Sequence, residues 1–119
     1  MPLSISTETI AGIEVVHLKG AILFGEDSAA LRASVRAPLE QCKKVVLDMR
    51  GVTRIDSSGL GTLIALYASA HRCGTQVKLA NLGAHSKEVL QITRLLTVFE
   101  VFDSVEAAVA SFDAAKSAR

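Results

Sequence analysis

Two adjacent serines beside an aspartate are the residues of this chain best placed to do chemistry. Asp56, Ser57 and Ser58 follow a β-rich run and open an apolar segment with helical spacing. Aspartate and serine side chains accept hydrogen bonds from the free N–H groups of a helix's first turn, where the helix dipole also favours a negative group. A cap needs only one hydroxyl, so we assign Ser57 a functional role, whereas for Ser58 a plain cap and a function stay equally open. We expect the Ser57 hydroxyl to be exposed, so that a phosphate on it would be tolerated locally but repelled by Asp56.

This corner fails the sequence tests for a serine enzyme. The segment 53–61 lacks the Gly-x-Ser-x-Gly motif of a nucleophile elbow. Nothing in the sequence brings His17, His71 or His85 to Ser57, and His71 lies more than about three turns further along the same expected helix. We therefore predict that the protein is not an enzyme, and keep a small serine hydrolase or transferase as the least favoured alternative.

Signals for a cofactor or a metal are weak. The run Ser58-Gly59-Leu60-Gly61 lacks the Gly-x-x-x-x-Gly-Lys-Ser/Thr loop and has no lysine beside it, so it indicates a nucleotide site only poorly. The histidines and cysteines are dispersed, which argues against metal ligation. Cys42 and Cys73 lack Cys-x-x-Cys spacing. We expect no cofactor and no metal, and two free thiols in or near the core rather than a disulfide.

Composition limits the classes of protein further. The 119 residues, half of them hydrophobic, are enough for one core and too few for two, so we predict a single domain over residues 1–119. We expect residues 114–119 to fray. A net charge of +1, with scattered Lys and Arg, one Tyr and no Trp, argues against nucleic-acid or membrane partners. No apolar run could span a bilayer and no secretory signal is visible, so we expect a cytoplasmic location.

Apolar periodicity predicts the elements that hold this corner. The expected strands are Thr7–Thr9, Ile13–Leu18 after a turn at Gly12, Val45–Leu47, Val77–Leu79 and Val98–Phe102. The expected helices carry the stripe Leu31, Val35 and Leu39, then run over 59–72, from a cap at Ser86 to Leu96, and from an Asp103–Glu106 capping box through Phe112. Because strands alternate with helices, we predict an α/β fold with a largely parallel sheet.

Three local features carry expectations of their own. The run Asp48-Met49-Arg50-Gly51 is typical of a turn. Val77 and Leu79 alternate with Gln76 and Lys78, which predicts a half-buried strand. Gly59 and Gly61 each cost a helix roughly 1 kcal/mol relative to Ala. Something must therefore favour glycine there, either a strand that approaches closely or the backbone of a partner protein.

The hexapeptide Asp56-Ser57-Ser58-Gly59-Leu60-Gly61, after a Val-Val-Leu-Asp strand, resembles the signature of STAS domains. It is most similar to that of bacterial anti-sigma factor antagonists. The resemblance covers essentially the whole chain and includes Ile55, Gly20, the Leu31/Leu39 helix, Gly74 and the segment Leu95–Phe102. It implies a single STAS-type domain in which a mixed β-sheet has its helices packed mainly on one face.

The resemblance also implies a switch at Ser57. In the family, the serine after the aspartate is phosphorylated by an anti-sigma factor that is also a serine kinase. The unphosphorylated antagonist binds that factor and frees the sigma factor, and the phosphorylated antagonist lets go until a serine phosphatase resets it. The implied partner-binding residues are Leu23, Phe24, Glu26, Asp27, Asp56, Ser58, Gly59 and Leu60.

One loop departs from the family pattern. Family members often have Gly-x-Leu-Asp before the first helix, whereas Gly20 here begins an apolar run and acids arrive only at Glu26 and Asp27. An exposed Leu23 or Phe24 would indicate a hydrophobic contact with a partner or between the two copies of a homodimer. The alternative is a scaffold without a switch, because STAS-like domains also serve in stress-signalling, transporter and lipid-transport complexes.

Overall fold

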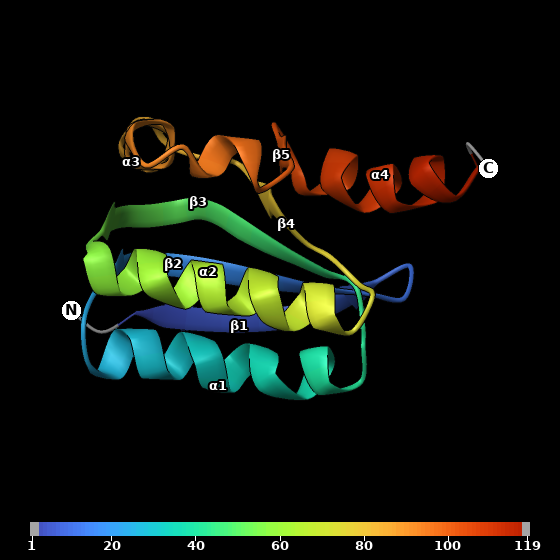
Figure 1. The fold of residues 1–119 in the computed structure, drawn as a ribbon, viewed down its shortest axis with the longest axis horizontal. Helices are drawn as coiled ribbons and strands as arrows, with labels where there is room; N and C mark the ends of the chain where they lie inside the picture. Colours follow the sequence, from blue (N-terminus) through green and yellow to red (C-terminus); the bar gives the residue numbers. More distant parts are fainter. Residues whose placement is uncertain (1–2, 118–119) are drawn as a thin grey trace.

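A five-stranded sheet forms the centre of the computed structural model (Figure 1). The structure describes the backbone of residues 3–117 and the side chains of residues 3–112. The elements in chain order are β1 (Ser4–Ile10), β2 (Ile13–Ile22), α1 (Glu26–Glu40), β3 (Val45–Ile55), α2 (Ser57–Arg72), β4 (Val77–Ala80), α3 (Ala84–Ile92), the 3-10 turn η1 (Leu95–Thr97), β5 (Val101–Phe102) and α4 (Val105–Ser117). The frayed tail expected for residues 114–119 lies beyond the side chains that are described.

The sheet is mixed, as the resemblance to STAS domains implies. Its strand order is β1-β2-β3-β4-β5. β1 and β2 form an antiparallel hairpin through Ala11 and Gly12, which have φ angles of 52° and 79°. The other three pairings are parallel, and each joins strands connected through a helix. The expected α/β architecture is confirmed.

The helices divide unequally between the two faces of the sheet. One core cluster contains Leu31 and Val35 of α1, Leu63 of α2 and Leu90 of α3. A smaller cluster on the opposite face packs α4 against β2, β3 and β4, and Phe112 belongs to it. Burying these apolar side chains is the main favourable term in folding. Three helices therefore cover one face and α4 covers part of the other, as the resemblance implies.

The turn predicted at residues 48–51 is wrong, because β3 continues through it to Ile55. His17 pairs with Asp48, but Lys19 pairs with Gly51, so β3 carries one extra residue there. A bulge of this kind bends a strand without ending it. A Cβ on Gly51 would lie 2.8 Å from the backbone oxygen of Leu18, which explains the glycine.

The half-buried character predicted for β4 is also wrong, since all four of its residues are buried. Lys78 is 1% exposed because α4 covers the face on which its side chain lies. Its ammonium group donates to Ser111 Oγ at 2.7 Å, lies 3.5 Å from Glu100 Oε1 and sits 4.1 Å from the ring centroid of Phe112. These partners offset the cost of burying a charge.

Two predicted caps move to neighbouring residues. Gly83, rather than Ser86, caps α3, and the Ser86 hydroxyl is buried without a partner in the described part of the chain. At α4 the N–H of Ala107 donates to Ser104 Oγ at 3.0 Å, so Ser104 acts where the sequence predicts Asp103. Serine and aspartate are equivalent caps in a sequence pattern, so only the backbone distinguishes them.

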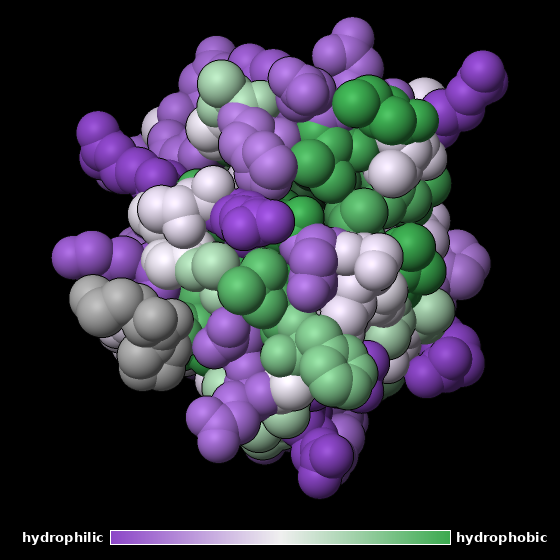
Figure 2. Space-filling model, turned by 90° about the vertical axis from the view of Figure 1, so that its left-hand side faces the viewer, coloured by the Kyte–Doolittle hydropathy of each residue, from purple (hydrophilic) through white to green (hydrophobic). Residues whose placement is uncertain are grey.

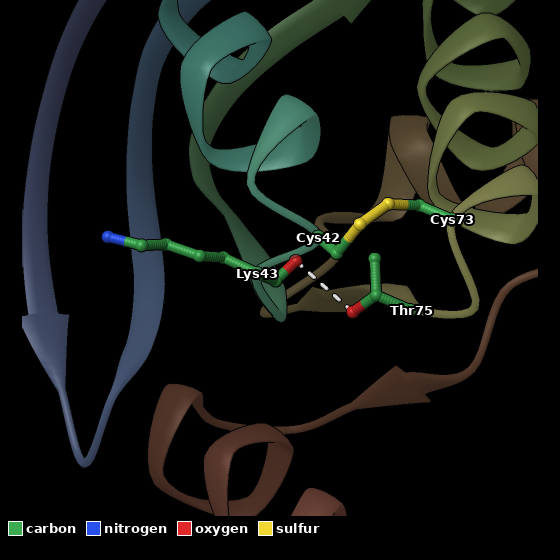
Figure 3. Close-up of a disulfide and its surroundings, with 4 residues drawn as sticks. All are labelled: Cys42, Lys43, Cys73 and Thr75. Atoms are coloured by element: carbon green, nitrogen blue, oxygen red, sulfur yellow. Dashed lines mark hydrogen bonds between the residues drawn. A yellow bond between two sulfur atoms is a disulfide. The ribbon is translucent and has the colours of Figure 1, made fainter.

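The two cysteines are joined in a disulfide, which corrects the expectation of free thiols (Figure 3). Cys42 follows α1 and Cys73 caps the end of α2, with their Cα atoms 5.5 Å apart. Beside them, Thr75 Oγ1 donates to the carbonyl of Lys43 at 3.1 Å. The bridge forms because two neighbouring helices end together, a relation that a separation of 31 residues does not reveal.

Candidate functional site

Asp56 joins β2, β3 and α2 at one corner of the molecule. It caps α2, and its Oδ1 accepts from the N–H of Gly59 at 2.8 Å. Its Oδ2 accepts from the N–H of Phe24 at 3.0 Å, in the loop between β2 and α1. Hydrogen bonds from Gly59 and then Phe24 hold the pKa of this carboxyl below its usual value. A charged carboxylate therefore fastens the β2–α1 loop to the first turn of α2.

Neither serine caps the helix, because Asp56 fills that role. Ser57 is exposed, and its hydroxyl makes no hydrogen bond to any described residue. Ser58 is half-buried, and its Oγ lies 3.5 Å from Ser28 Oγ of α1. The corner therefore presents one free hydroxyl, that of Ser57, to solvent.

Gly59 allows α2 to begin directly against the end of β2. A Cβ on this buried glycine would lie 2.3 Å from the backbone oxygen of Ile22 and 3.0 Å from Ile55 Cγ2. The sequence suggests the close approach of a strand as one reason for a glycine, and that reason holds for Gly59. A Cβ on Gly61 would meet nothing within 4 Å, so the same explanation fails for that glycine.

The other predicted partner-binding residues lie in the β2–α1 loop and at the start of α1, and they differ in exposure. Leu23 is half-buried, whereas Phe24 is 82% exposed beside Asp56. Glu26 is exposed, but Asp27 Oδ1 accepts from the N–H of Leu3 at 3.0 Å and so anchors the start of β1. Phe24 and Glu26 are therefore available for contact, and Asp27 is engaged within the fold.

One surface of α2 continues this corner. Ser57, Leu60, Gly61 and Ile64 share a helical face, since residues three and four apart are neighbours on a helix. Leu60 is half-buried against the core and Ile64 is 45% exposed. We call these four residues and Phe24 the switch face. α1 and α2 begin at one end of the molecule, where Figure 2 shows hydrophobic residues among polar ones.

The three histidines make their contacts with residues other than Ser57. His85 Nε2 accepts from the N–H of Ile55 at 3.3 Å and so supports the end of β3. His17 lies between Glu8 and Asp48, and His71 stacks on Tyr67. No hydrogen bond joins a histidine to Ser57 within residues 3–112. No three His, Cys, Asp or Glu side chains in that range are grouped to hold a metal ion.

The sequence indicates Ser28 only as one of three possible caps of α1, and it gives no sign of the contact made by His85. Ser28 is buried in the first turn of α1, and its hydroxyl donates to the carbonyl of Leu23 at 2.8 Å. The Glu-Asp-Ser run could have indicated this local hydrogen bond, because serines near helix starts often make one. The contact of His85 arises between α3 and β3, and no local pattern indicates it.

No helix within residues 3–117 combines the length and the apolar character that crossing a membrane requires.

Two relatives match this chain over most of its length. BtrV of Bordetella bronchiseptica is 27% identical over 114 residues, which are 95% of this chain and 97% of that protein. A Paenibacillus polymyxa protein named anti-sigma F factor antagonist is 23% identical over 105 residues, or 87% of this chain and 90% of that one.

Solved structures share the fold. The anti-sigma factor antagonist SpoIIAA in its unphosphorylated form has a TM-score of 0.78 at 16% identity, and the match covers 93% of this chain and 97% of that chain. The phosphorylated form of Bacillus SpoIIAA has a TM-score of 0.73 at 18% identity and covers 92% and 99%. A family model described as the STAS domain matches residues 4–108. This chain therefore belongs to the STAS domain family.

Proposed function

We propose that this protein is an anti-sigma factor antagonist controlled by phosphorylation of Ser57. The unphosphorylated protein binds an anti-sigma factor that is also a serine kinase, a phosphate on Ser57 releases it, and a serine phosphatase resets the protein. The observation that carries this proposal is the Ser57 hydroxyl, which is exposed and makes no hydrogen bond within the described residues. The names of the Bordetella and Paenibacillus relatives, which are both called anti-sigma factor antagonists, support the class of partner.

The local electrostatics explain how one phosphate would change binding while the fold persists. A phosphoserine carries about −1.5 to −2 charges at neutral pH. The start of α2 tolerates that charge, because free N–H groups and the helix dipole favour an anion there. Asp56 is already charged at this point, since its pKa lies below the usual value. A partner that covered Ser57 would then have to remove two adjacent negative groups from water.

The apolar part of the switch face supplies the attraction in the unphosphorylated state. Phe24 is 82% exposed and Ile64 is 45% exposed, so both offer apolar area to a docking surface. Aromatic side chains often dominate the binding energy of protein interfaces. A phosphate beside these residues would keep water in the contact and weaken it.

The test is calorimetric binding to the anti-sigma kinases of the source organism. We expect Ser57→Ala to bind as wild type and Ser57→Asp to bind more than about tenfold more weakly, because like charges in an interface cost several kcal/mol. Ser6→Asp is the matched control, since it adds the same charge to an exposed serine of β1. Equal affinity of Ser57→Asp and wild type would favour a scaffold without a switch.

A further inference from the structure

A groove between α1 and α2 lies outside the switch face. α1 and α2 lie side by side and run in the same direction (Figure 1). The groove between them has a volume of about 480 Å³ and is lined by the later turns of both helices. Cys73 forms part of its wall, and the bridge to Cys42 ties the two helix ends together there (Figure 3). The bridge therefore fixes the spacing of α1 and α2 at this end of the groove.

Three arginines line this groove. Arg32 and Arg36 come from α1 and Arg72 comes from α2, whereas Glu40 is the one acidic side chain in the lining. None of the three guanidinium groups forms an ion pair with a carboxylate of residues 3–112.

Their hydrogen bonds leave most of their capacity unused. Arg32 Nη2 donates to Thr62 Oγ1 at 3.5 Å, and Arg72 Nη2 donates to Ser69 Oγ at 3.3 Å. A guanidinium group has five N–H donors, so most of these donors have no hydrogen-bond partner within residues 3–112. The groove is thus a net positive surface, because its lining has three arginines and one carboxylate, that of Glu40.

The floor of the groove is apolar. Leu39 and Leu66 line it while remaining only 6% and 5% exposed, and Ala65 lies beside them. A small inorganic anion would use the arginines but would leave this floor wet. A ligand that suits both parts carries carboxylates next to aliphatic groups, because arginine forks match carboxylates and the floor removes apolar area from water.

We infer that this groove binds an acidic segment of a protein partner in which Asp or Glu residues alternate with aliphatic ones. Arg32 and Arg36 are one helical turn apart, about 6 Å along the axis. Carboxylates at alternate positions of an extended chain are about 6.6 Å apart, so two of them can face this pair. Arg72, on the α2 side of the groove, adds to its positive charge. The binding does not require Ser57, and so goes beyond the proposed switch.

The probe is a fluorescein-labelled peptide of alternating Glu and Leu, titrated with the full chain at low salt. We expect saturable binding that Arg36→Glu weakens by roughly tenfold or more, because a charge-assisted contact becomes a repulsion. Lys19→Glu is the matched control, since it makes the same charge change at an exposed residue of β2 that does not line the groove. Ser57→Ala should leave the affinity unchanged.

Amide chemical shifts of the labelled wild-type protein give a readout that needs no variant. We expect the peptide to shift resonances in the segments 32–40 and 65–73, which form the groove. Equal loss of affinity in Lys19→Glu and Arg36→Glu would overturn the inference, as would shifts confined to other residues. So would equal binding of a Gln-Leu peptide, or displacement by an equal concentration of inorganic phosphate.

Discussion

The two glycines in the first turns of α2 should respond in opposite ways to the same substitution. In Gly59→Ala the new Cβ would lie 2.3 Å from the Ile22 carbonyl oxygen and 3.0 Å from Ile55 Cγ2. The carbonyl cannot move freely, because it also accepts from the N–H of Asp56 at 3.3 Å. Overpacking against backbone typically costs about 1–3 kcal/mol. The clash should exceed the gain of about 1 kcal/mol that alanine brings to a helix.

Gly61→Ala has no such cost, since nothing lies within 4 Å of its Cβ position. It should therefore stabilise the protein by about 0.5–1 kcal/mol, the ordinary helix preference for alanine. We expect Gly59→Ala to lose about 2 kcal/mol, so the two variants should differ by about 3 kcal/mol. For a domain of this size that difference is roughly 10 °C in Tm.

Urea unfolding followed by circular dichroism measures both variants under one protocol. A shift of the midpoint at constant m-value reports a change in stability rather than in the unfolded state. If Gly59→Ala proved as stable as Gly61→Ala, the close contact between α2 and β2 would be refuted. The placement of Asp56 and Ser57 would then lose its physical basis.

Three further predictions concern Phe24 in the β2–α1 loop, the disulfide, and His17 with its two carboxylate partners. Phe24→Ser should weaken binding of the anti-sigma factor by about tenfold or more in calorimetry. It should leave the urea midpoint unchanged, because Phe24 is 82% exposed. An unchanged affinity would exclude Phe24 from the contact. Cys42→Ser should lower the free energy of unfolding by about 3–4 kcal/mol, the loop-closure value for a separation of 31 residues. Thiol titration of the unfolded wild type without reductant should find no free Cys42 or Cys73, and two titratable thiols would contradict the bridge. Hydrogen bonds to Asp48 and then Glu8 raise the pKa of His17, so its stabilising effect should be complete below about pH 6.5 and lost as pH rises through the folded value. Urea unfolding at pH 6 and pH 8 should show this loss of stability in wild type and not in His17→Asn. An equal change in stability between the two pH values in both proteins would contradict it.

The acid side of this last effect belongs to Asp48. Burial raises its pKa, but hydrogen bonds from Asn81, His17 and the N–H of Arg50 outweigh burial and lower it. Its contribution is therefore present above about pH 3.8 and is lost as pH falls through the folded value. The cluster should stabilise the fold most between about pH 4 and 6.5.

Local sequence patterns predict a helix or strand well where its apolar residues lie on one face or where capping residues mark its start. The stripe of Leu31, Val35 and Leu39 identifies α1 because its period is helical and its other residues face water. The start of α2 is visible because Asp56 and two serines precede an apolar run. These signals depend on residues close in sequence, so no tertiary knowledge is needed.

Tertiary contacts decide the features that the sequence does not show. Lys78 alternates with apolar residues and so suggests an open face, but α4 arrives from the end of the chain to cover it. The Asp48–Gly51 run contains turn-forming residues, yet pairing with β2 holds it in the sheet as a bulge. At the site, the exposure of Ser57 follows from local capping, whereas the engagement of Asp27 by Leu3 depends on β1.

The central claim is that Ser57 presents the hydroxyl that switches partner binding. The most direct test incubates the protein with ATP and the anti-sigma kinase of its source organism, then combines intact mass, phosphosite mapping and binding. The account predicts one added phosphate, located on Ser57, and loss of the complex in step with its appearance. A phosphate on another residue, or a Ser57-phosphorylated protein that binds as tightly as before, would contradict it.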